Sequence, residues 1–177
     1  MKIRVSSVQY HLHTIQSFEE FAQQCEHYVK AALEFDAEFI LFPEFLTTQL
    51  LSIKDANGTM LTINDLPSFT EPYRNLFSSF AKRYNVHIIG GTHVIEINGQ
   101  LQNTAHLFYP DGQIKMQAKL HITPTEVHEW NMAAGHTLEV FDTVKGKIAL
   151  LTCYDIECPE IVRMAKAKGV DSIFCPS

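Results

Sequence analysis

Two periods of hydrophobic positions run through this sequence, one typical of amphipathic helices and one typical of β-strands. Over residues 17–35 apolar side chains recur at helical spacing, and Ser17 forms a capping-box pattern with Glu20 at the start of the segment. Residues 69–84 and 159–168 also have a helical pattern. We therefore expect three helices.

Shorter apolar runs predict strands around these helices. Residues 2–9 alternate between apolar and polar side chains, whereas residues 148–151 are continuously apolar, as in a strand buried on both faces. The turn Asp111-Gly112 joins two further runs into a hairpin. Strands alternate with helices early and late in the chain, which indicates an α/β fold with a mixed sheet. The expected strands cover residues 2–9, 37–42, 86–94, 101–109, 113–118, 138–142, 147–151 and 170–175.

Two long connections separate these elements. Residues 46–67 carry the turn signal Asn57-Gly58, and we expect a long surface excursion beside the functional site, with room for a short helix. Residues 120–136 are expected to form a loop rich in His and Glu. The chain ends straight after its last expected strand, which would leave the sheet uncovered there, so we expect residues 1–177 to be part of a longer domain.

Composition and charge exclude several classes of function. A chain of 177 residues with 46% hydrophobic and 19% charged residues is long enough for one globular domain with a sizeable core. A net charge of -6 argues against nucleic acid as the main partner, because phosphate binding needs a basic surface. The N-terminal residues do not form a signal peptide, and no apolar run has the length of a membrane span, so we expect no membrane partner.

The cysteines and histidines indicate neither a disulfide framework nor a metal centre. Cys25, Cys153, Cys158 and Cys175 form no C-x-x-C pair, which favours reduced thiols and a cytoplasmic location. The histidines cluster in loops without a ligand set that fixes a metal. We therefore expect no metal and no cofactor.

Three reactive side chains follow expected strands, namely Glu44, Lys119 and Cys153. Ligands of α/β sheets bind beyond the carboxyl ends of strands, so the three would converge if their strands are neighbours. A carboxylate can take the thiol proton, the thiolate can form a thioester, and an ammonium can stabilise the oxyanion, with the N–H of Tyr154 as a second donor. Cys153 also lies close to the start of the helix at 159–168, which can lower the pKa of a thiol.

Each of these residues, taken alone, has a simpler explanation. Single cysteines are more often buried structural residues than nucleophiles. Glu44 after Pro43 could be a solvated turn residue, and Lys119 a surface lysine at a strand end. Spacing alone therefore does not establish a catalytic triad.

Three segments, in this order, resemble the catalytic motifs of the nitrilase superfamily of carbon–nitrogen hydrolases. Residues 39–44 resemble the motif of the general-base glutamate, residues 117–121 the lysine motif, and residues 151–160 the nucleophile motif. Residues 5–9 and 90–92 also look like the family. The resemblance spans the whole chain.

This resemblance implies a fold and a site. The fold would be a four-layer α-β-β-α sandwich with two mixed sheets, of which residues 1–177 would form about the N-terminal two thirds and lack the C-terminal part. Glu44 would be the general base, Lys119 the electrostatic stabiliser and Cys153 the nucleophile. A second glutamate after the lysine positions it or the substrate in the family; Glu126 is our choice and Glu129 the alternative.

The resemblance also implies a substrate and an assembly. The substrate would be a small-molecule amide-type compound, no cofactor would be needed, and the protein would form a homodimer or larger homo-oligomer through helices such as residues 159–168. Glu157 departs from the family, since many members carry a basic residue at this position, so a contact usually made by arginine would be absent or inverted.

Two other functions stay open at this point. An acyltransferase would use the same thioester and pass it to an amine instead of water. A non-catalytic fragment or interaction module would carry the reactive groups without holding them in productive geometry.

Overall fold

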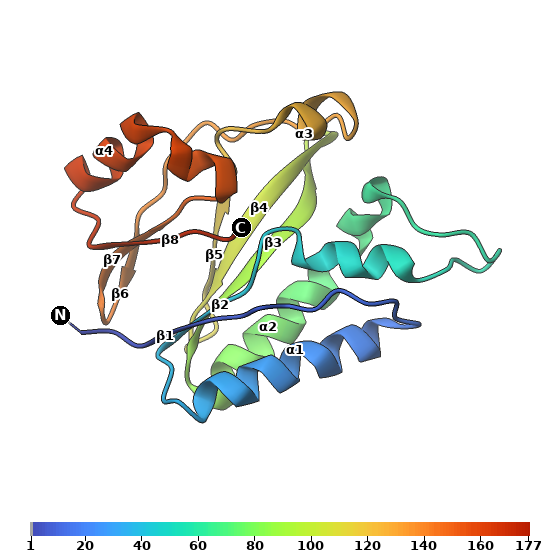
Figure 1. Ribbon diagram of the computed structural model, residues 1–177, viewed down its shortest axis with the longest axis horizontal. Coiled ribbons are helices and arrows are strands. Elements are labelled where there is room, and N and C mark those ends of the chain that lie inside the picture. Colours follow the sequence, from blue (N-terminus) through green and yellow to red (C-terminus); the bar gives the residue numbers. More distant parts are fainter. Residues whose placement is uncertain (1) are drawn as a thin grey trace.

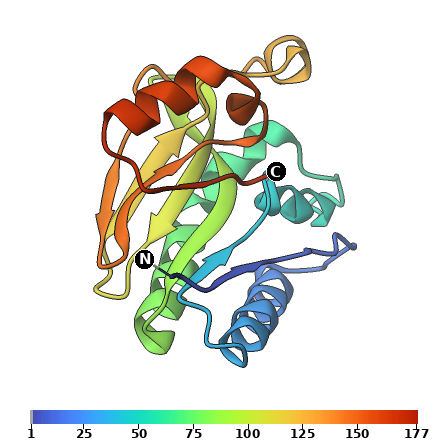
Figure 2. The same cartoon turned by 60° about the vertical axis from the view of Figure 1, so that its left-hand side comes forward.

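Two β-sheets face each other in the computed structural model, which describes residues 2–177, and helices cover the outer side of each sheet (Figure 1). Helices α1 (Phe18–Leu33) and α2 (Thr70–Tyr84) lie on the outer face of the larger sheet. Helix α4 (Pro159–Ala167) lies on the outer face of the smaller sheet, and the turned view separates α4 and α1 onto opposite faces (Figure 2). The predicted four-layer α-β-β-α sandwich is therefore confirmed.

The larger sheet has five strands in the order β1-β2-β3-β4-β5. The first three strands run parallel to one another, and β4 and β5 each pair antiparallel with the strand before them. Parallel strands need crossover connections, which α1 and α2 supply. The strands are β1 (Val5–Ser7), β2 (Phe39–Leu41), β3 (His87–Ile97), β4 (Gln100–Phe108) and β5 (Ile114–Ala118).

The smaller sheet has three strands in the order β6-β7-β8. Strands β6 (Phe141–Thr143) and β7 (Gly146–Leu150) form an antiparallel hairpin, and β8 (Ser172–Phe174) pairs with β7 in parallel after the crossover through α4. Both sheets contain parallel and antiparallel pairs, so the predicted mixed character is confirmed, and β6 begins a second sheet that packs on the face of the first.

Three hydrophobic clusters fill the spaces between the four layers. The cluster between α1, α2 and the larger sheet includes Phe21 and Phe77. The cluster between the two sheets includes Phe39 and Leu150, and the one beneath α4 includes Ile161. Each fully buried side chain of this kind stabilises the fold by about 1.5–3 kcal/mol relative to an exposed one.

The three predicted helices are present, and their ends follow local signals. The N–H of Glu20 donates to the side chain of Ser17 at the start of α1, as the capping pattern predicts, and Pro159 opens α4. The eight predicted strands are also present, although most are shorter than predicted and β3 is longer.

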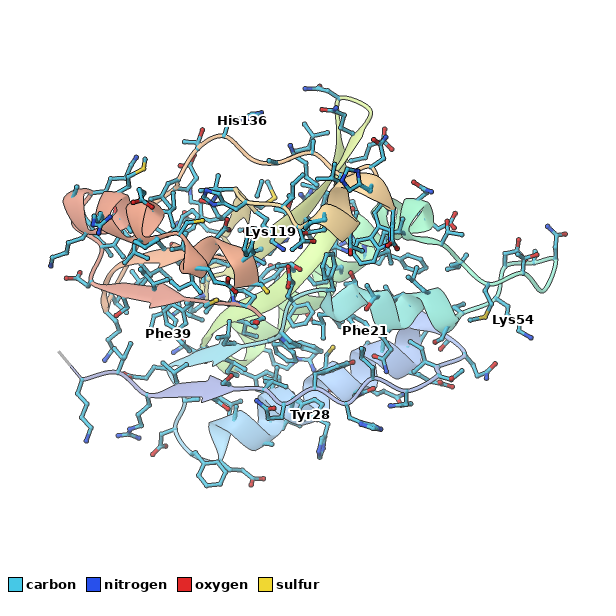
Figure 3. The ribbon with its side chains drawn as sticks, turned by 45° about the horizontal axis from the view of Figure 1, so that its top comes forward. Phe21, Tyr28, Phe39, Lys54, Lys119 and His136 are labelled. Carbon is cyan, nitrogen blue, oxygen red and sulfur yellow. The ribbon has the colours of Figure 1, made fainter. Side chains whose placement is uncertain are left out.

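The two long connections differ from their predictions. Residues 46–67 were expected to be a surface excursion, but the 3-10 helices η1 (Leu46–Ser52) and η2 (Ile63–Phe69) bury Leu50 and Leu66 in the core, because apolar side chains recur along this segment. Only the tip around Lys54 projects from the body (Figure 3). The expected loop at 120–136 contains a short helix, α3 (Pro124–His128).

None of the helices within residues 2–177 has the length and apolar character needed to cross a lipid bilayer. All four cysteines are free thiols; Cys25 is buried, whereas Cys153, Cys158 and Cys175 are half-buried.

Candidate active site

Glu44, Lys119 and Cys153 converge between the two sheets. The strands that they follow are not neighbours in one sheet, so the condition under which convergence was expected is not the one that brings them together. Glu44 follows β2 and Lys119 directly follows β5, two strands that run in the same direction and end at the same edge of the larger sheet. Cys153 follows β7 of the smaller sheet, which packs on the larger one. The side chain of Lys119 lies in the interior (Figure 3).

The Lys119 ammonium is the centre of the site. Its Nζ donates to Glu44 Oε1 at 2.8 Å and to Glu126 Oε2 at 2.7 Å. The side chains of Lys119 and Glu126 are each 1% exposed, and that of Glu44 is 11% exposed. A buried ammonium therefore lies between two carboxylates, which is the pairing that a buried charge needs.

The pKa values of this group favour its charged forms. Burial lowers the pKa of Lys119, but hydrogen bonds to Glu126 and Glu44 outweigh it, and the net pKa lies above its ordinary value. Burial raises the pKa of the Glu126 carboxyl, but donors from Lys119 and from the backbone of Thr123 outweigh it, and the net pKa lies below its ordinary value. Lys119 is therefore an ammonium and Glu126 a carboxylate at neutral pH.

Glu126 is held by the start of α3. The Thr123 hydroxyl accepts from Glu126 N–H, and the Thr123 N–H donates to Glu126 Oε2 at 2.8 Å, which is a reciprocal capping box. Glu129, the alternative second glutamate, is exposed. The sequence Thr123-Pro124-Thr125-Glu126 carries the signal for this helix, since threonine is followed by proline at the first helical position and by glutamate three residues on.

The turn after β2, which is hydrogen-bonded to β3, fixes the position of Glu44. Phe45 has a left-handed backbone with φ of 53°, and its N–H donates to Thr92 Oγ1 at 2.7 Å. Thr92 N–H donates to the Pro43 carbonyl at 3.3 Å. These bonds come from a bulge in β3, where the register with β4 shifts between Ile89 and Thr92. The residues before and after Glu44 are therefore both hydrogen-bonded to Thr92 of β3.

Asp155 ties the cysteine segment to the lysine segment. Its buried carboxylate accepts from the N–H groups of His121 at 2.7 Å and Leu120 at 3.1 Å, and also from Thr152 N–H at 3.1 Å. Thr152 precedes Cys153, and Leu120 follows Lys119. One carboxylate therefore links the segments that carry Cys153 and Lys119.

Cys153 is the first residue of a 3-10 helix, η3 (Cys153–Glu157), and has a left-handed backbone with φ of 44°. Its N–H donates to the Pro176 carbonyl at 2.9 Å, which anchors it to the segment after β8. Non-glycine residues in this conformation are uncommon and occur at functional sites. The Cys153 thiol is half-buried and lies close enough to Glu44 and Lys119 for both charges to act on its pKa.

The predicted lowering of the Cys153 pKa is wrong. Burial raises the pKa of the Cys153 thiol, and the negative charge of Glu44 raises it further, while a hydrogen bond with Ser177 and the charge of Lys119 act in the opposite direction. The prediction relied on the start of α4 and did not include the adjacent carboxylate. The resting site therefore holds a protonated thiol beside a carboxylate that can accept its proton.

The remaining predicted residues lie as follows. The N–H of Tyr154 directly follows Cys153, and the Tyr154 side chain is exposed. Glu157 is exposed at the end of η3. Asn103 on β4, which the sequence did not single out, donates to both Glu44 and Glu126. Within residues 2–177 no group of three or more His, Cys, Asp or Glu side chains is arranged to hold a metal ion.

Two hollows accompany this region. One of about 590 Å³ is lined by Phe45, next to Glu44, and by Glu129 and Trp130, shortly after Glu126. The Phe45 and Trp130 rings contact edge to face, with centroids 5.2 Å apart. The larger hollow of about 1010 Å³ lies between the β4–β5 turn and the β6–β7 hairpin and contains none of the charged site residues. The smaller hollow is therefore the one that lies beside the site, because its lining residues are close in sequence to Glu44 and Glu126.

Comparisons with known proteins agree with this geometry. The chain is 47% identical over 174 residues to the Bacillus subtilis (strain 168) protein named "Probable hydrolase YhcX", a match that covers 98% of this chain and 34% of that protein. It is 25% identical over 183 residues to Omega-amidase NIT2 of Xenopus tropicalis, covering 99% of this chain and 63% of that protein. The chain thus spans about a third of the first relative and less than two thirds of the second.

A solved structure shows the same fold. Saccharomyces cerevisiae Nit3, a member of branch 10 of the nitrilase superfamily, matches with a TM-score of 0.78 at 19% identity, covering 99% of this chain and 64% of Nit3. The model of the carbon–nitrogen hydrolase family matches residues 4–177. Because that match takes in nearly every residue, including all three segments that carry the site, the chain belongs to the carbon–nitrogen hydrolase family.

Proposed function

We propose that this chain carries the catalytic site of an amidase-type hydrolase that cleaves a small-molecule amide through a cysteine thioester. The observation that carries the proposal is the contact of three groups: a half-buried thiol, a carboxylate close enough to shift its pKa, and a buried ammonium bonded to that carboxylate. Lys119 occupies Oε1 of Glu44, which leaves Oε2 to accept the thiol proton.

The first half of the reaction forms the thioester. Glu44 takes the proton of the Cys153 thiol as the sulfur attacks the amide carbonyl carbon. The Lys119 ammonium and the Tyr154 N–H stabilise the negative charge on the carbonyl oxygen. Glu44 then returns the proton to the leaving nitrogen, the carbon–nitrogen bond breaks, and ammonia or an amine departs.

The second half releases the acid. The oxygen of a water molecule attacks the thioester carbonyl carbon while Glu44 takes a proton from that water. Glu44 passes the proton to the Cys153 sulfur when the carbon–sulfur bond breaks. Glu126 reacts with nothing in this scheme. Its carboxylate keeps Lys119 charged and in place, which is consistent with the raised pKa of Lys119.

The amide class of substrate has two supports. One relative is named as an omega-amidase, and the family acts on carbon–nitrogen bonds by its description. The hollow beside Phe45 and Trp130 has an aromatic wall that suits the acyl part of a small amide.

The cytoplasmic location and the homo-oligomeric assembly both stay predictions. Sedimentation velocity of the purified protein tests the assembly.

A product assay with matched cysteine variants tests the proposal. The protein is incubated with a panel of short aliphatic and aromatic amides, released ammonia is measured, and the acyl-enzyme is sought by intact-protein mass spectrometry. We expect turnover and a thioester adduct on Cys153, and loss of both in Cys153→Ala. Cys158→Ala, which removes another half-buried thiol, is the control and should retain activity.

Two results would contradict the proposal. Full activity in Cys153→Ala would exclude the thioester. Condensation of the acyl group with added amine in preference to water would replace the hydrolase by the acyltransferase alternative.

A further inference from the structure

Asn103 is hydrogen-bonded to all three charged residues of the site, Glu44, Glu126 and Lys119. One Nδ2 hydrogen is directed at Glu44 Oε1 and the other at Glu126 Oε1, each at a nitrogen–oxygen distance of 2.8 Å. The Asn103 backbone carbonyl accepts from Lys119 N–H, also at 2.8 Å. The residue is 1% exposed and lies near the start of β4, beside the end of β5, which Lys119 directly follows.

These contacts address an electrostatic problem of the site. Glu44, Glu126 and Lys119 together carry two negative charges and one positive charge, so the carboxylates repel each other across the cation. A primary amide has two hydrogens to donate and no charge. Asn103 can therefore join the two carboxylates without a second cation, which would compete with Lys119 for them.

The orientation of the amide supports this assignment. With Nδ2 toward the carboxylates, Asn103 Oδ1 is a buried acceptor without a hydrogen-bond partner in the described part of the chain. The reverse orientation would place Oδ1 against two carboxylate oxygens. Two bonds to charged acceptors outweigh one unpaired carbonyl, since bonds to charged groups are the stronger kind.

We propose that Asn103 is a positioning residue that fixes Glu44 and Glu126 as a pair around Lys119 and keeps Oε2 of Glu44 free for the thiol proton. This inference rests on the proposed function of Glu44 as the base. Asn103 and Lys119 both occupy Oε1 of Glu44, so rotation of this carboxylate breaks two bonds at once. Asn103 therefore acts on the reaction through Glu44 without touching the substrate.

The test compares substitutions that separate charge from shape. Asn103→Leu removes both donors at similar volume, and Asn103→Asp keeps the shape but adds a third carboxylate. We expect kcat to fall by about 10- to 100-fold in Asn103→Leu with a smaller change in KM, because each lost bond to a charged group is equivalent to about one factor of ten. Asn103→Asp should be the more damaged of the two, since it repels both glutamates.

A second measurement does not require turnover. The carboxyl-carbon NMR signal of Glu126, assigned with Glu126→Gln, is followed against pH in the unmodified protein and in Asn103→Leu. Asn103 is one of the donors that lower the pKa of Glu126, so this pKa should rise in the variant. Asn103→Ser, which is small and loses the reach to both carboxylates, replaces Asn103→Leu if that variant does not fold.

Gln49→Leu is the matched control. Gln49 is a buried side-chain amide that donates to His13 and Gln24 and touches none of the site residues. The Gln49→Leu variant should have a lower thermal stability, with kcat, KM and the pKa of Glu126 unchanged.

Two outcomes would overturn the inference. Asn103→Asp that is as active as the unmodified protein, or more active than Asn103→Leu, would show that only the shape of Asn103 matters. An unchanged pKa of Glu126 in Asn103→Leu would show that the amide does not hold this carboxylate. Failure of the proposed function is distinct, because the unmodified protein would then lack turnover while the NMR titration still supports or overturns the inference.

Discussion

A Cβ atom added to Gly91 would lie 2.1 Å from the carbonyl oxygen of Pro43. Gly91 belongs to the bulge of β3 and has φ of +68°, a conformation that favours glycine. Pro43 immediately precedes Glu44. Glu44 thus lies where it does because Gly91 has no side chain at the point where the turn after β2 crosses β3.

Gly91→Ala should destabilise the protein by at least about 3 kcal/mol, because the backbone oxygen of Pro43 cannot yield as a flexible side chain can. Urea unfolding measures the change. The control is Gly99→Ala, which has a similar φ of +77° but nothing within 4 Å of the added atom, so it reports the cost of the backbone conformation alone, about 1 kcal/mol. Equal losses in the two variants would contradict the close contact.

Replacing the central cation should be costlier than replacing an exposed one. Lys119→Met leaves two buried carboxylates without their partner, and such a loss destabilises a protein by about 3–5 kcal/mol. Arg163→Ala removes a pair with Glu160 in which both side chains are mostly exposed, and it should change little. Thermal unfolding of both variants gives the comparison, and a recovery of stability in Lys119→Met combined with Glu126→Gln is the further expected result.

The sequence predicted the site residues that carry local signals. Glu44, Lys119 and Cys153 each lie within three residues of the end of a strand and in segments that resemble family motifs, and Ser17 and Pro159 mark helix starts, so short segments were enough to find them. Asn103 was missed because its partners lie 59 and 23 residues away in the chain and its position within β4 has no pattern of its own. Asp155 lies within residues 151–160, but its hydrogen bonds to Leu120 and His121 depend on the packing of the two sheets.

The pKa of Cys153 failed as a prediction for a related reason. Proximity to a helix start can be seen in the sequence, whereas the distance to Glu44 depends on how the smaller sheet packs on the larger one. Burial between the sheets is the largest cause of the raised pKa, and the charge of the adjacent Glu44 carboxylate acts in the same direction. The sequence could name the partners of the thiol but could not rank their effects.

Glu44→Gln should therefore make Cys153 more reactive toward iodoacetamide while it abolishes turnover. After burial, the charge of Glu44 is a cause that raises the pKa of this thiol, so its removal increases the thiolate fraction. We expect alkylation at pH 8 to be faster in Glu44→Gln than in the unmodified protein. Peptide mapping by mass spectrometry identifies the modified cysteine.

Cys25 provides the internal reference for that experiment. It is fully buried, burial raises its pKa, and it should remain unmodified in both proteins under native conditions. Slower alkylation of Cys153 in Glu44→Gln than in the unmodified protein would mean that the carboxylate activates the resting thiol instead of keeping it protonated.

Two buried histidines should make the fold sensitive to mild acid. Burial lowers the pKa of His93 and of His106 from 6.5 to about 3, and the charge of Arg74 acts in the same direction on both. Between these values the unfolded chain binds a proton that the folded chain does not, so the free energy of unfolding is highest above pH 6.5 and falls as the pH falls toward 3. Each histidine contributes up to about 1.4 kcal/mol per pH unit in this window.

His106→Asn tests the size of this effect, because the asparagine amide can replace the ring Nδ1–H that donates to the Thr104 carbonyl at 3.1 Å, without a titrating group. Urea unfolding at pH 7, 6 and 5 should show a shallower loss of stability with acid in His106→Asn than in the unmodified protein, even if its stability at pH 7 is lower. The exposed His128 supplies the control variant His128→Asn, which should keep the original slope. An identical slope in all three proteins would mean that His106 is already protonated in the folded state or titrates as it does in the unfolded chain.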